Sequence, residues 1–221
     1  MLKGYGAVIL DGAWLTLQLA LSSMALAIVL GLIGVALRLS PVRWLAWLGD
    51  LYSTVIRGIP DLVLILLIFY GGQDIINRVA PLLGYEDYID LNPLIAGIGT
   101  LGFIFGAYLS ETFRGAFLGI PKGQAEAGVA YGMSPRQVFF RIQVPQMIRL
   151  AIPGFTNNWL VLTKATALIS VVGLQDMMFK AKQAADATRE PFTFFLAVAA
   201  LYLVLTSVSL LALKYLERRY S

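Results

Sequence analysis

The sequence predicts an all-α membrane protein with five transmembrane helices, because its composition is unusually apolar and its apolar stretches are long. Apolar residues occupy 58% of the 221 positions and charged residues only 14%, well below the quarter that is typical of soluble domains. Crossing the hydrocarbon core takes about 20 helical residues. Five stretches meet that length and together form one transmembrane domain over residues 1–221. The spans are expected at 13–37, 50–72, 93–115, 150–173 and 192–213.

The composition also excludes several kinds of site. The chain has no Cys and no His, which removes disulfides, thiol nucleophiles, His general bases and the usual zinc and haem ligands. A membrane enzyme would therefore lack a nucleophile–base pair, and we expect no bound metal or cofactor. The net charge of +4 comes from basic residues scattered between apolar stretches, so no nucleic-acid partner is expected.

The distribution of Lys and Arg predicts an external N-terminus and an internal C-terminus. With five spans in that orientation, eleven of the 17 basic residues lie inside, five lie outside and Lys164 lies within the fourth span. This bias is what the positive-inside rule requires. The first apolar stretch is too long for a signal-peptide core and is interpreted as an uncleaved span. The external loop 73–92 is acidic, with one basic residue against four acids: Arg78 against Asp74, Glu86, Asp87 and Asp90.

The longest internal loop runs from Pro121 to Pro145 and predicts two short helices joined by a glycine turn. Pro121 suits a first helical position, and Gly132 suits the left-handed residue beyond a helix end. Ser134 and Gln137 have the spacing of a capping box at the start of the second helix. Pro145 is expected to stop that helix, because proline cannot donate the backbone hydrogen bond.

This hairpin carries more apolar side chains than so small a unit can bury. One interpretation is an amphipathic hairpin on the inner membrane surface, and the other is a docking element for a cytoplasmic protein. The apolar side chains are Ala127, Val129, Ala130, Tyr131, Val138, Phe139, Phe140 and Ile142.

The same loop resembles the cytoplasmic signature of bacterial ABC-importer permeases, Glu-Ala-Ala-x3-Gly-x9-Ile-x-Leu-Pro. The resemblance implies that the helix pair docks into a groove of a separate ATPase, which would bind ATP and Mg. The chain has no G-x-x-x-x-G-K-[ST] phosphate loop, so it is expected to be non-catalytic. The matching residues are Glu126, Ala127, Gly132, Ile142 and Pro145, and the departures are Gly128 for Ala and Val144 for Leu.

Further stretches resemble the polar amino-acid branch of these permeases. Residues 57–63 and 105–117 are most similar to Q-type permease subunits of importers for histidine, lysine, arginine and ornithine. The resemblance implies a type I importer fold in the bacterial inner membrane. It also implies a second permease subunit in a heterodimer, two ATPase subunits and a periplasmic amino-acid-binding protein. The expected cargo is a basic amino acid, with glutamine or an opine as the open alternative.

Asp61 is the first candidate ligand for such a cargo. It is expected near the middle of the second span, beside a helix break at Gly58 and Pro60. A charged group in the bilayer is costly and is usually functional. A carboxylate suits a guanidinium or ammonium group. The alternative is a structural ion pair of Asp61 with Lys164 or Arg57.

Glu111 and Tyr108 are further candidates on the third span. They share a helix face with Arg114, at three-residue spacing. The alternative is a local ion pair of Glu111 with Arg114. A secondary carrier that uses Asp61 or Glu111 as a proton relay is a second functional class, but it leaves the internal hairpin unexplained.

The fourth span is unusually polar, and its hydroxyls and amides could bind the backbone of an amino acid. Its polar residues are expected to form one stripe that faces a cavity. The alternative is hydrogen bonding between helices, the commoner use of such residues in membranes. Many relatives have an acidic residue where this chain has Ala165. The stripe consists of Asn157, Thr163, Thr166 and Ser170.

Overall fold

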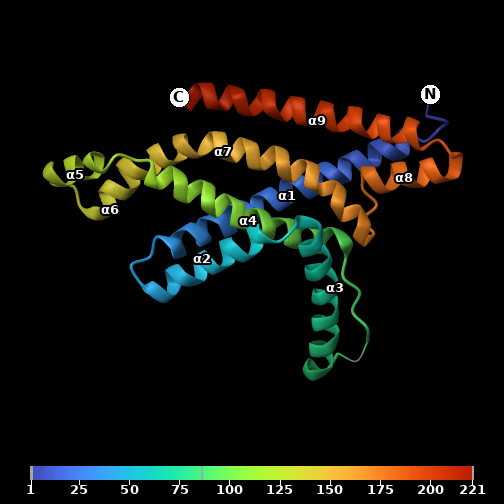
Figure 1. The fold of residues 1–221 in the computed structure, drawn as a ribbon, viewed down its shortest axis with the longest axis horizontal. Coiled ribbons are helices and arrows are strands. Elements are labelled where there is room, and N and C mark those ends of the chain that lie inside the picture. The colour runs from blue at the N-terminus through green and yellow to red at the C-terminus, as the bar shows by residue number, and fades with distance from the viewer. Residues whose placement is uncertain (1, 86, 221) are drawn as a thin grey trace.

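The structure is a computed structural model that describes residues 2–85 and 87–220, so Glu86 of the acidic loop lies outside the described residues. The described residues form helices without a strand (Figure 1). In chain order the elements are α1 (Gly6–Arg38), α2 (Arg43–Gly58), α3 (Asp61–Val79), the 3-10 helix η1 (Ala80–Leu83), α4 (Pro93–Leu118), α5 (Lys122–Ala130), α6 (Pro135–Val138), the π-helix η2 (Phe139–Gln143), α7 (Val144–Ala165), the 3-10 helix η3 (Thr166–Val172), α8 (Met177–Thr188) and α9 (Pro191–Tyr220).

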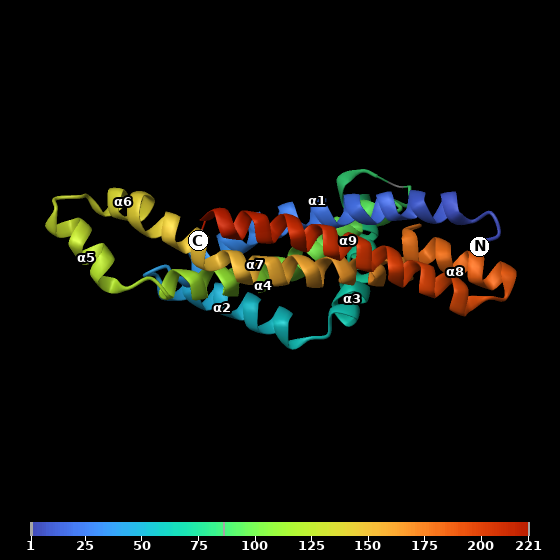
Figure 2. The same cartoon turned by 90° about the horizontal axis from the view of Figure 1, so that it is seen from above.

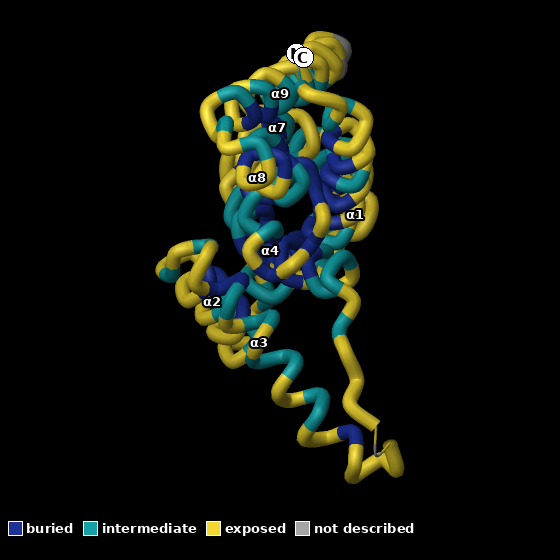
Figure 3. The backbone as a smooth tube through the Cα atoms, turned by 90° about the vertical axis from the view of Figure 1, so that its right-hand side faces the viewer, coloured by how far each residue is buried: buried dark blue, intermediate teal, exposed yellow. Residues whose placement is uncertain are grey.

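The centre of the bundle is the close packing of α1 against α4. Small residues recur at four-residue spacing on α4, at Gly102, Gly106 and Ser110. A Cβ atom added at Gly106 would lie 2.8 Å from Cβ of Leu30, and one added at Gly34 would lie 2.7 Å from the Ser110 hydroxyl. Small residues let helix backbones approach closely in membranes, where contact between helices cannot rely on the hydrophobic effect. The buried residues form a large cluster, mainly from α1, α4 and α7, and a smaller one from the start of α1, α8 and α9 (Figure 3).

Four helices are long and apolar enough to cross a membrane, and a bent helix pair brings the number to five within the described residues. Helices α1, α4 and α9 cover the expected first, third and fifth spans. The fourth span is the bent pair, in which α7 and η3 follow α6 and η2, and α8 lies beyond a 54° bend. Helix α8 falls in a segment where the sequence predicted no helix. It packs on α1 and α9 through its buried alanines and Met177.

The expected second span, 50–72, needs correction, because no continuous helix covers it. Helix α2 ends at Gly58, and α3 begins only after the extended residues Ile59 and Pro60. Proline lacks the backbone N–H and disfavours helical geometry in the residue before it, so the helix cannot continue. The apolar stretch of span length is instead Asp61–Leu83. It projects away from the other long helices (Figures 1 and 3).

The segments predicted to be internal share one end of the bundle, whereas the predicted external loop after α3 lies at the tip of that projecting helix (Figure 1). The α5–α6 hairpin, the connection from α1 to α2 and the C-terminal end of α9 lie towards one end (Figures 1 and 2). The N-terminal residues and α8 lie at the opposite end (Figure 2). All segments predicted to be internal are therefore on the same side. Which side faces the cytoplasm stays a prediction from the Lys and Arg distribution.

The hairpin has the predicted turn chemistry. Gly132 has a φ of 82°, the left-handed conformation that favours glycine. The capping box is confirmed: the backbone N–H of Gln137 donates to the Ser134 hydroxyl, and the backbone N–H of Ser134 donates to the Gln137 side chain. Pro121 stands one residue earlier than predicted, as the N-cap of α5.

The prediction that Pro145 ends the second helix is wrong. The chain stays helical from α6 through the π-helical turn η2 into α7, with Pro145 in the first turn of α7. In the wider turn the backbone N–H of Val144 donates to the carbonyl of Phe139, five residues back. The π-turn sets a new start for α7, where the missing N–H of a proline costs no hydrogen bond. The hairpin is thus joined to α7 by continuous helix.

Candidate functional site

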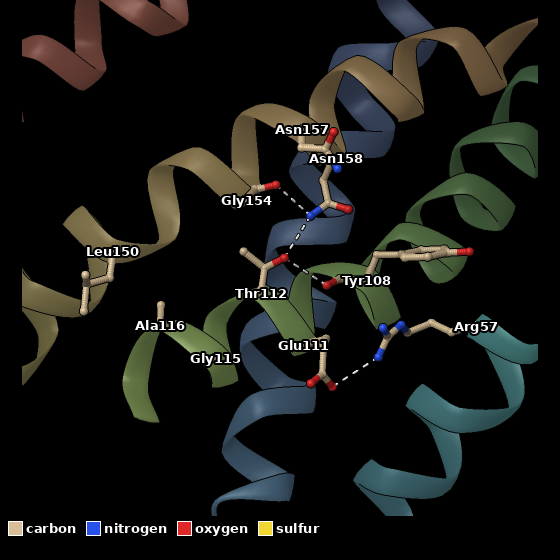
Figure 4. A pocket seen from close by; sticks show the side chains of 10 residues that line it. All are labelled: Arg57, Tyr108, Glu111, Thr112, Gly115, Ala116, Leu150, Gly154, Asn157 and Asn158. Carbon is tan, nitrogen blue, oxygen red and sulfur yellow. Dashed lines mark hydrogen bonds and ion pairs between the residues drawn. The ribbon is translucent and has the colours of Figure 1, made fainter. Parts of the chain in front are cut away.

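A cavity of ≈ 350 Å³ lies between the C-terminal half of α4, the middle of α7 and the end of α2 (Figure 4). Its size is within the range of small-ligand sites. Its wall combines charged, amide and hydroxyl groups with Gly115, Ala116, Leu150 and Gly154. The polar lining residues are Arg57, Tyr108, Glu111, Thr112, Asn157 and Asn158.

Glu111 is the centre of an ion-pair network at this cavity. Its Oε2 accepts from Nη1 of Arg38 and lies 3.2 Å from Nη1 of Arg57, whereas its Oε1 lies 3.7 Å from Nη1 of Arg114. Arg38 also donates from Nε to Asp50, at 2.8 Å, and its side chain is only 9% exposed. The local pair with Arg114 exists but is the longest of the three. Glu111 therefore joins α1, α2 and α4 as well as lining the cavity.

Asp61 lies beside the cavity as the first residue of α3, and not in the middle of a span. The Tyr108 hydroxyl, which belongs to the cavity wall, donates to its Oδ1 at 3.4 Å. Asp61 forms no ion pair with a described residue. The predicted alternative, a structural ion pair with Lys164 or Arg57, is therefore wrong. The structure thus brings Asp61, Tyr108 and Glu111 together.

Two neighbouring amides of α7 have different roles. The Asn158 amide is buried, and it donates to the Thr112 hydroxyl and to the Gly154 carbonyl, at 2.9 Å each. Thr112 in turn donates to the Tyr108 carbonyl at 3.2 Å. This chain of hydrogen bonds fixes α7 against α4 at the floor of the cavity. Asn157 is exposed on the cavity wall and is free to contact a ligand (Figure 4).

The predicted polar stripe of the fourth span does not form one face. Only Asn157 lines the cavity. The Thr163 hydroxyl donates to the Trp159 carbonyl, and the Thr166 hydroxyl donates to the Thr163 carbonyl and lies 3.2 Å from the Tyr202 hydroxyl of α9. The Ser170 hydroxyl donates to the Ala167 carbonyl. The change from α-helix to 3-10 helix at Thr166 also alters the angular spacing. The alternative of hydrogen bonding between helices fits Thr166 alone, because the hydroxyls of Thr163 and Ser170 donate within their own helical segments.

The hairpin presents the signature residues in two groups. Glu126 and Ala127 are exposed on α5. Ile142 packs inwards, because a Cβ atom at the buried Gly128 would lie 2.7 Å from its Cδ1. The departure from alanine at position 128 therefore brings the two helices closer together. The surface left uncovered includes Tyr131, which is 90% exposed, and Phe140.

Sequence reasoning missed the role of Arg38 and the Asn158–Thr112 bond. Arg38 is one of the basic residues that the charge distribution places inside, and that distribution assigns it no partner. The contact joins residues 73 positions apart, and nothing in the local pattern predicts it. Asn158 is a polar residue within a predicted span, but its partner on α4 becomes evident only from helix packing.

Comparison with known proteins places the chain in a family. Residues 15–221 match the family model described as the binding-protein-dependent transport system inner membrane component. The chain belongs to this family. The permease is 51% identical to the histidine/lysine/arginine/ornithine transport system permease protein HisQ of Escherichia coli (strain K12), over all of this chain and 96% of that protein. It is 40% identical to the octopine transport system permease protein OccQ of Rhizobium radiobacter, over 93% of this chain and 87% of that protein.

Solved structures support the same fold for the permease. A crystal structure of an amino acid ABC transporter with histidines contains a chain that superposes with a TM-score of 0.84 at 27% identity, over 97% of the permease and 95% of that chain. An inward-facing structure of the MetNI methionine ABC transporter gives a TM-score of 0.74 at 21% identity, which shows the fold alone. The permease is thus a non-catalytic transmembrane subunit of an ABC importer.

Proposed function

We propose that this permease is a translocation subunit of an ABC importer for basic amino acids, namely histidine, arginine, lysine and ornithine. A separate ATPase would bind ATP and Mg and drive transport. The observation that carries the proposal is the cavity at α4 and α7, where Asp61, Tyr108 and Glu111 lie beside an exposed amide, Asn157. Carboxylates near the cavity favour a cationic side chain. The name of the HisQ relative supports the same cargo, whereas the name of the OccQ relative supports the opine alternative.

Asp61 is the carboxylate best suited to take the cargo cation. It has no ion-pair partner among the described residues, whereas Glu111 already contacts three guanidinium groups. The single bond to Asp61 comes from the neutral hydroxyl of Tyr108 and leaves further acceptor positions on the carboxylate unused. The remaining candidates in the cavity, Tyr108 and Asn157, would bind polar groups of the amino acid.

Uptake by the reconstituted complex tests the proposal. The permease is purified with its associated subunits, inserted into liposomes and supplied with arginine, lysine, histidine or glutamine, with and without internal ATP. ATP-dependent uptake that prefers the cationic amino acids is expected. Uptake without ATP, or a preference for glutamine, would contradict the proposal.

Asp61→Asn tests the cargo site itself. The change keeps the size and the bond from Tyr108 but removes the negative charge, so we expect the apparent affinity for arginine to fall about tenfold or more. Asp90→Asn is the matched control, because Asp90 is exposed on the external loop and outside the cavity. If Asp61→Asn leaves the affinity for arginine unchanged, the carboxylate is not a cargo ligand.

The α5–α6 hairpin is proposed as the docking element for the ATPase. It lies at one end of the bundle and exposes the aromatic rings of Tyr131 and Phe140 without a covering element (Figure 2). Since η2 makes the hairpin continuous with α7, a movement of the hairpin would reach the cavity along one continuous helical segment. Glu126, Ala127 and Gly132 belong to the proposed contact surface.

Loss of the ATPase from the purified complex tests this assignment. Tyr131→Ala removes the most exposed ring of the hairpin and is expected to reduce co-purification of the ATPase severalfold while leaving the permease folded. Tyr88→Ala removes a similarly exposed ring in the predicted external loop and serves as the control. Equal ATPase content in both variants would contradict docking at the hairpin.

A second permease subunit is proposed to cover α3. Helix α3 projects from the bundle, so only 11% of its most apolar 18-residue stretch is buried (Figure 3). The chain contains no Cys, so a single Cys introduced at the exposed Leu67 gives a unique cross-linking site. A cross-link to a second permease subunit in native membranes is expected.

A periplasmic binding protein would deliver cargo at the opposite end from the hairpin.

A further inference from the structure

Arg38 and Arg57, two of the three arginines at Glu111, differ in their exposure and in the number of carboxylates they contact. Arg38 is 9% exposed and is fixed by Glu111 and Asp50. Arg57 is 41% exposed, lines the cavity, and has Glu111 as its only carboxylate contact among the described residues. Arg38 is therefore a structural part of the network, whereas Arg57 is held by few contacts and is accessible to solvent.

Arg57 lies beside the Tyr108 ring, which a cationic cargo paired with Asp61 would also contact. Its guanidinium extends from the end of α2 into the cavity and lies 3.2 Å from Oε2 of Glu111 (Figure 4). Its Cζ is 6.0 Å from the ring centroid of Tyr108, which is also the tyrosine that donates to Asp61. A carboxylate and an aromatic face are the groups that recognise a guanidinium or ammonium ion. The cavity thus already holds a cationic side chain supplied by the permease itself.

We infer that Arg57 is an internal competitor for cationic cargo: a cargo cation that pairs with Asp61 must first displace the Arg57 guanidinium from the Tyr108 ring and thereby from Glu111. The inference rests on the proposed function and adds to it a residue that sets the affinity. The displacement is feasible because Arg57 is the last residue but one of α2, and Gly58 and the extended Ile59 follow it. In the unloaded permease the guanidinium would keep the cavity closed to free cations. A protein that binds ligand only in a partly populated open state shows a correspondingly reduced affinity.

Equilibrium binding of arginine to the intact importer complex in lipid nanodiscs, without ATP, tests this inference. Arg57→Gln removes the competing charge, so arginine is expected to bind about two- to fivefold more tightly, the range that a solvent-accessible ion pair supports. Arg57→Lys retains a competing cation and is expected to stay near the wild-type affinity.

Citrulline separates competition from a structural effect. It has the shape of arginine but carries a neutral urea group, so it does not compete for the cation position. Arg57→Gln is therefore expected to raise the affinity for arginine relative to citrulline by the same two- to fivefold, about the value of one exposed ion pair. Arg43→Gln is the matched control, because Arg43 is exposed at the start of the same helix as Arg57 and lies outside the cavity. It should leave the ratio of arginine affinity to citrulline affinity unchanged.

The outcomes separate a failure of the proposed transport function from a failure of the competition by Arg57. If the wild-type complex shows no ATP-dependent arginine uptake, the proposed function and the inference both fail. If wild-type uptake is normal but Arg57→Gln binds arginine no more tightly, or tightens citrulline equally, only the inference is overturned. Weaker binding of both ligands would identify Arg57 as a receptor for the cargo carboxylate, which also overturns it.

Discussion

Gly106→Ala is expected to force α1 and α4 apart, although it adds a single methyl group. The new Cβ would lie 2.8 Å from Cβ of Leu30 and 2.7 Å from the hydroxyl of Tyr52. A Cβ atom is attached directly to the backbone and cannot rotate away, so the helices themselves must move. The Tyr52 hydroxyl must also give up its 2.6 Å bond to the Phe103 carbonyl.

Three contributions determine how much Gly106→Ala lowers the free energy of unfolding. Overpacking of a close helix contact costs about 1–3 kcal/mol. The lost hydrogen bond of Tyr52 adds about 1 kcal/mol. The better helix propensity of alanine returns about 0.5–1 kcal/mol. The free energy of unfolding is therefore expected to fall by about 1–3 kcal/mol.

Unfolding of the purified complex in mixed micelles of mild detergent and dodecyl sulfate, followed by circular dichroism, measures this change. Gly99→Ala is the control, because Gly99 also lies in α4 but no atom outside its own helix backbone and chain neighbours lies within 4 Å of the added methyl. The control is expected to be neutral or slightly stabilising. If Gly106→Ala unfolds at the same detergent fraction as Gly99→Ala, the close approach of α1 and α4 does not limit stability and the reasoning is refuted.

Three further sets of substitutions test the hairpin, the cavity and the ion-pair network. Gly132→Ala places a side chain at a φ of 82°, which costs about 1–2 kcal/mol, and should reduce ATPase co-purification, whereas Gly123→Ala in α5 has open space and should not. Asn158→Ala removes the link between α7 and α4 and is expected to lower the free energy of unfolding by about 1–2 kcal/mol. Asn157→Ala should instead leave unfolding unchanged and raise the KM for uptake, and the opposite pattern for the two amides would contradict their assignment. Arg38→Met leaves two carboxylates without their shared guanidinium and should destabilise the complex by about 1–3 kcal/mol, measured by the same unfolding assay.

Much of the architecture was predictable because each signal is local. Spans follow from runs of apolar residues, and the capping box of Ser134 and the left-handed Gly132 follow from residues within one turn. The family signature is also a local signal, since it depends on fixed spacing within one hairpin. The prediction for Pro145 failed because the π-turn before it depends on how the hairpin meets α7, which the proline alone does not determine.

The candidate site was predictable as a set of residue types but not as an arrangement. Glu111, Tyr108 and Asp61 were recognisable because polar and charged groups are expensive in a bilayer. Their partners come from other helices: Arg38 from α1, Arg57 from α2, and the Thr112–Asn158 bond from the contact of α4 with α7. The polar stripe failed for the same reason, because hydroxyls such as that of Thr166 are satisfied within the helix and by Tyr202 of α9.

The sequence by itself determined that the chain is a bundle of membrane helices with a two-helix hairpin that carries the family signature, because hydropathy, capping and motif spacing act over short distances along the chain. Only the tertiary structure decided which carboxylate is free and which is occupied. Asp61 has a neutral partner and Glu111 has three cationic ones, and that difference arises from the close packing of α1, α2 and α4. Charges in a low-dielectric bundle take their properties from neighbours in space, and those neighbours are set by how helix faces fit together.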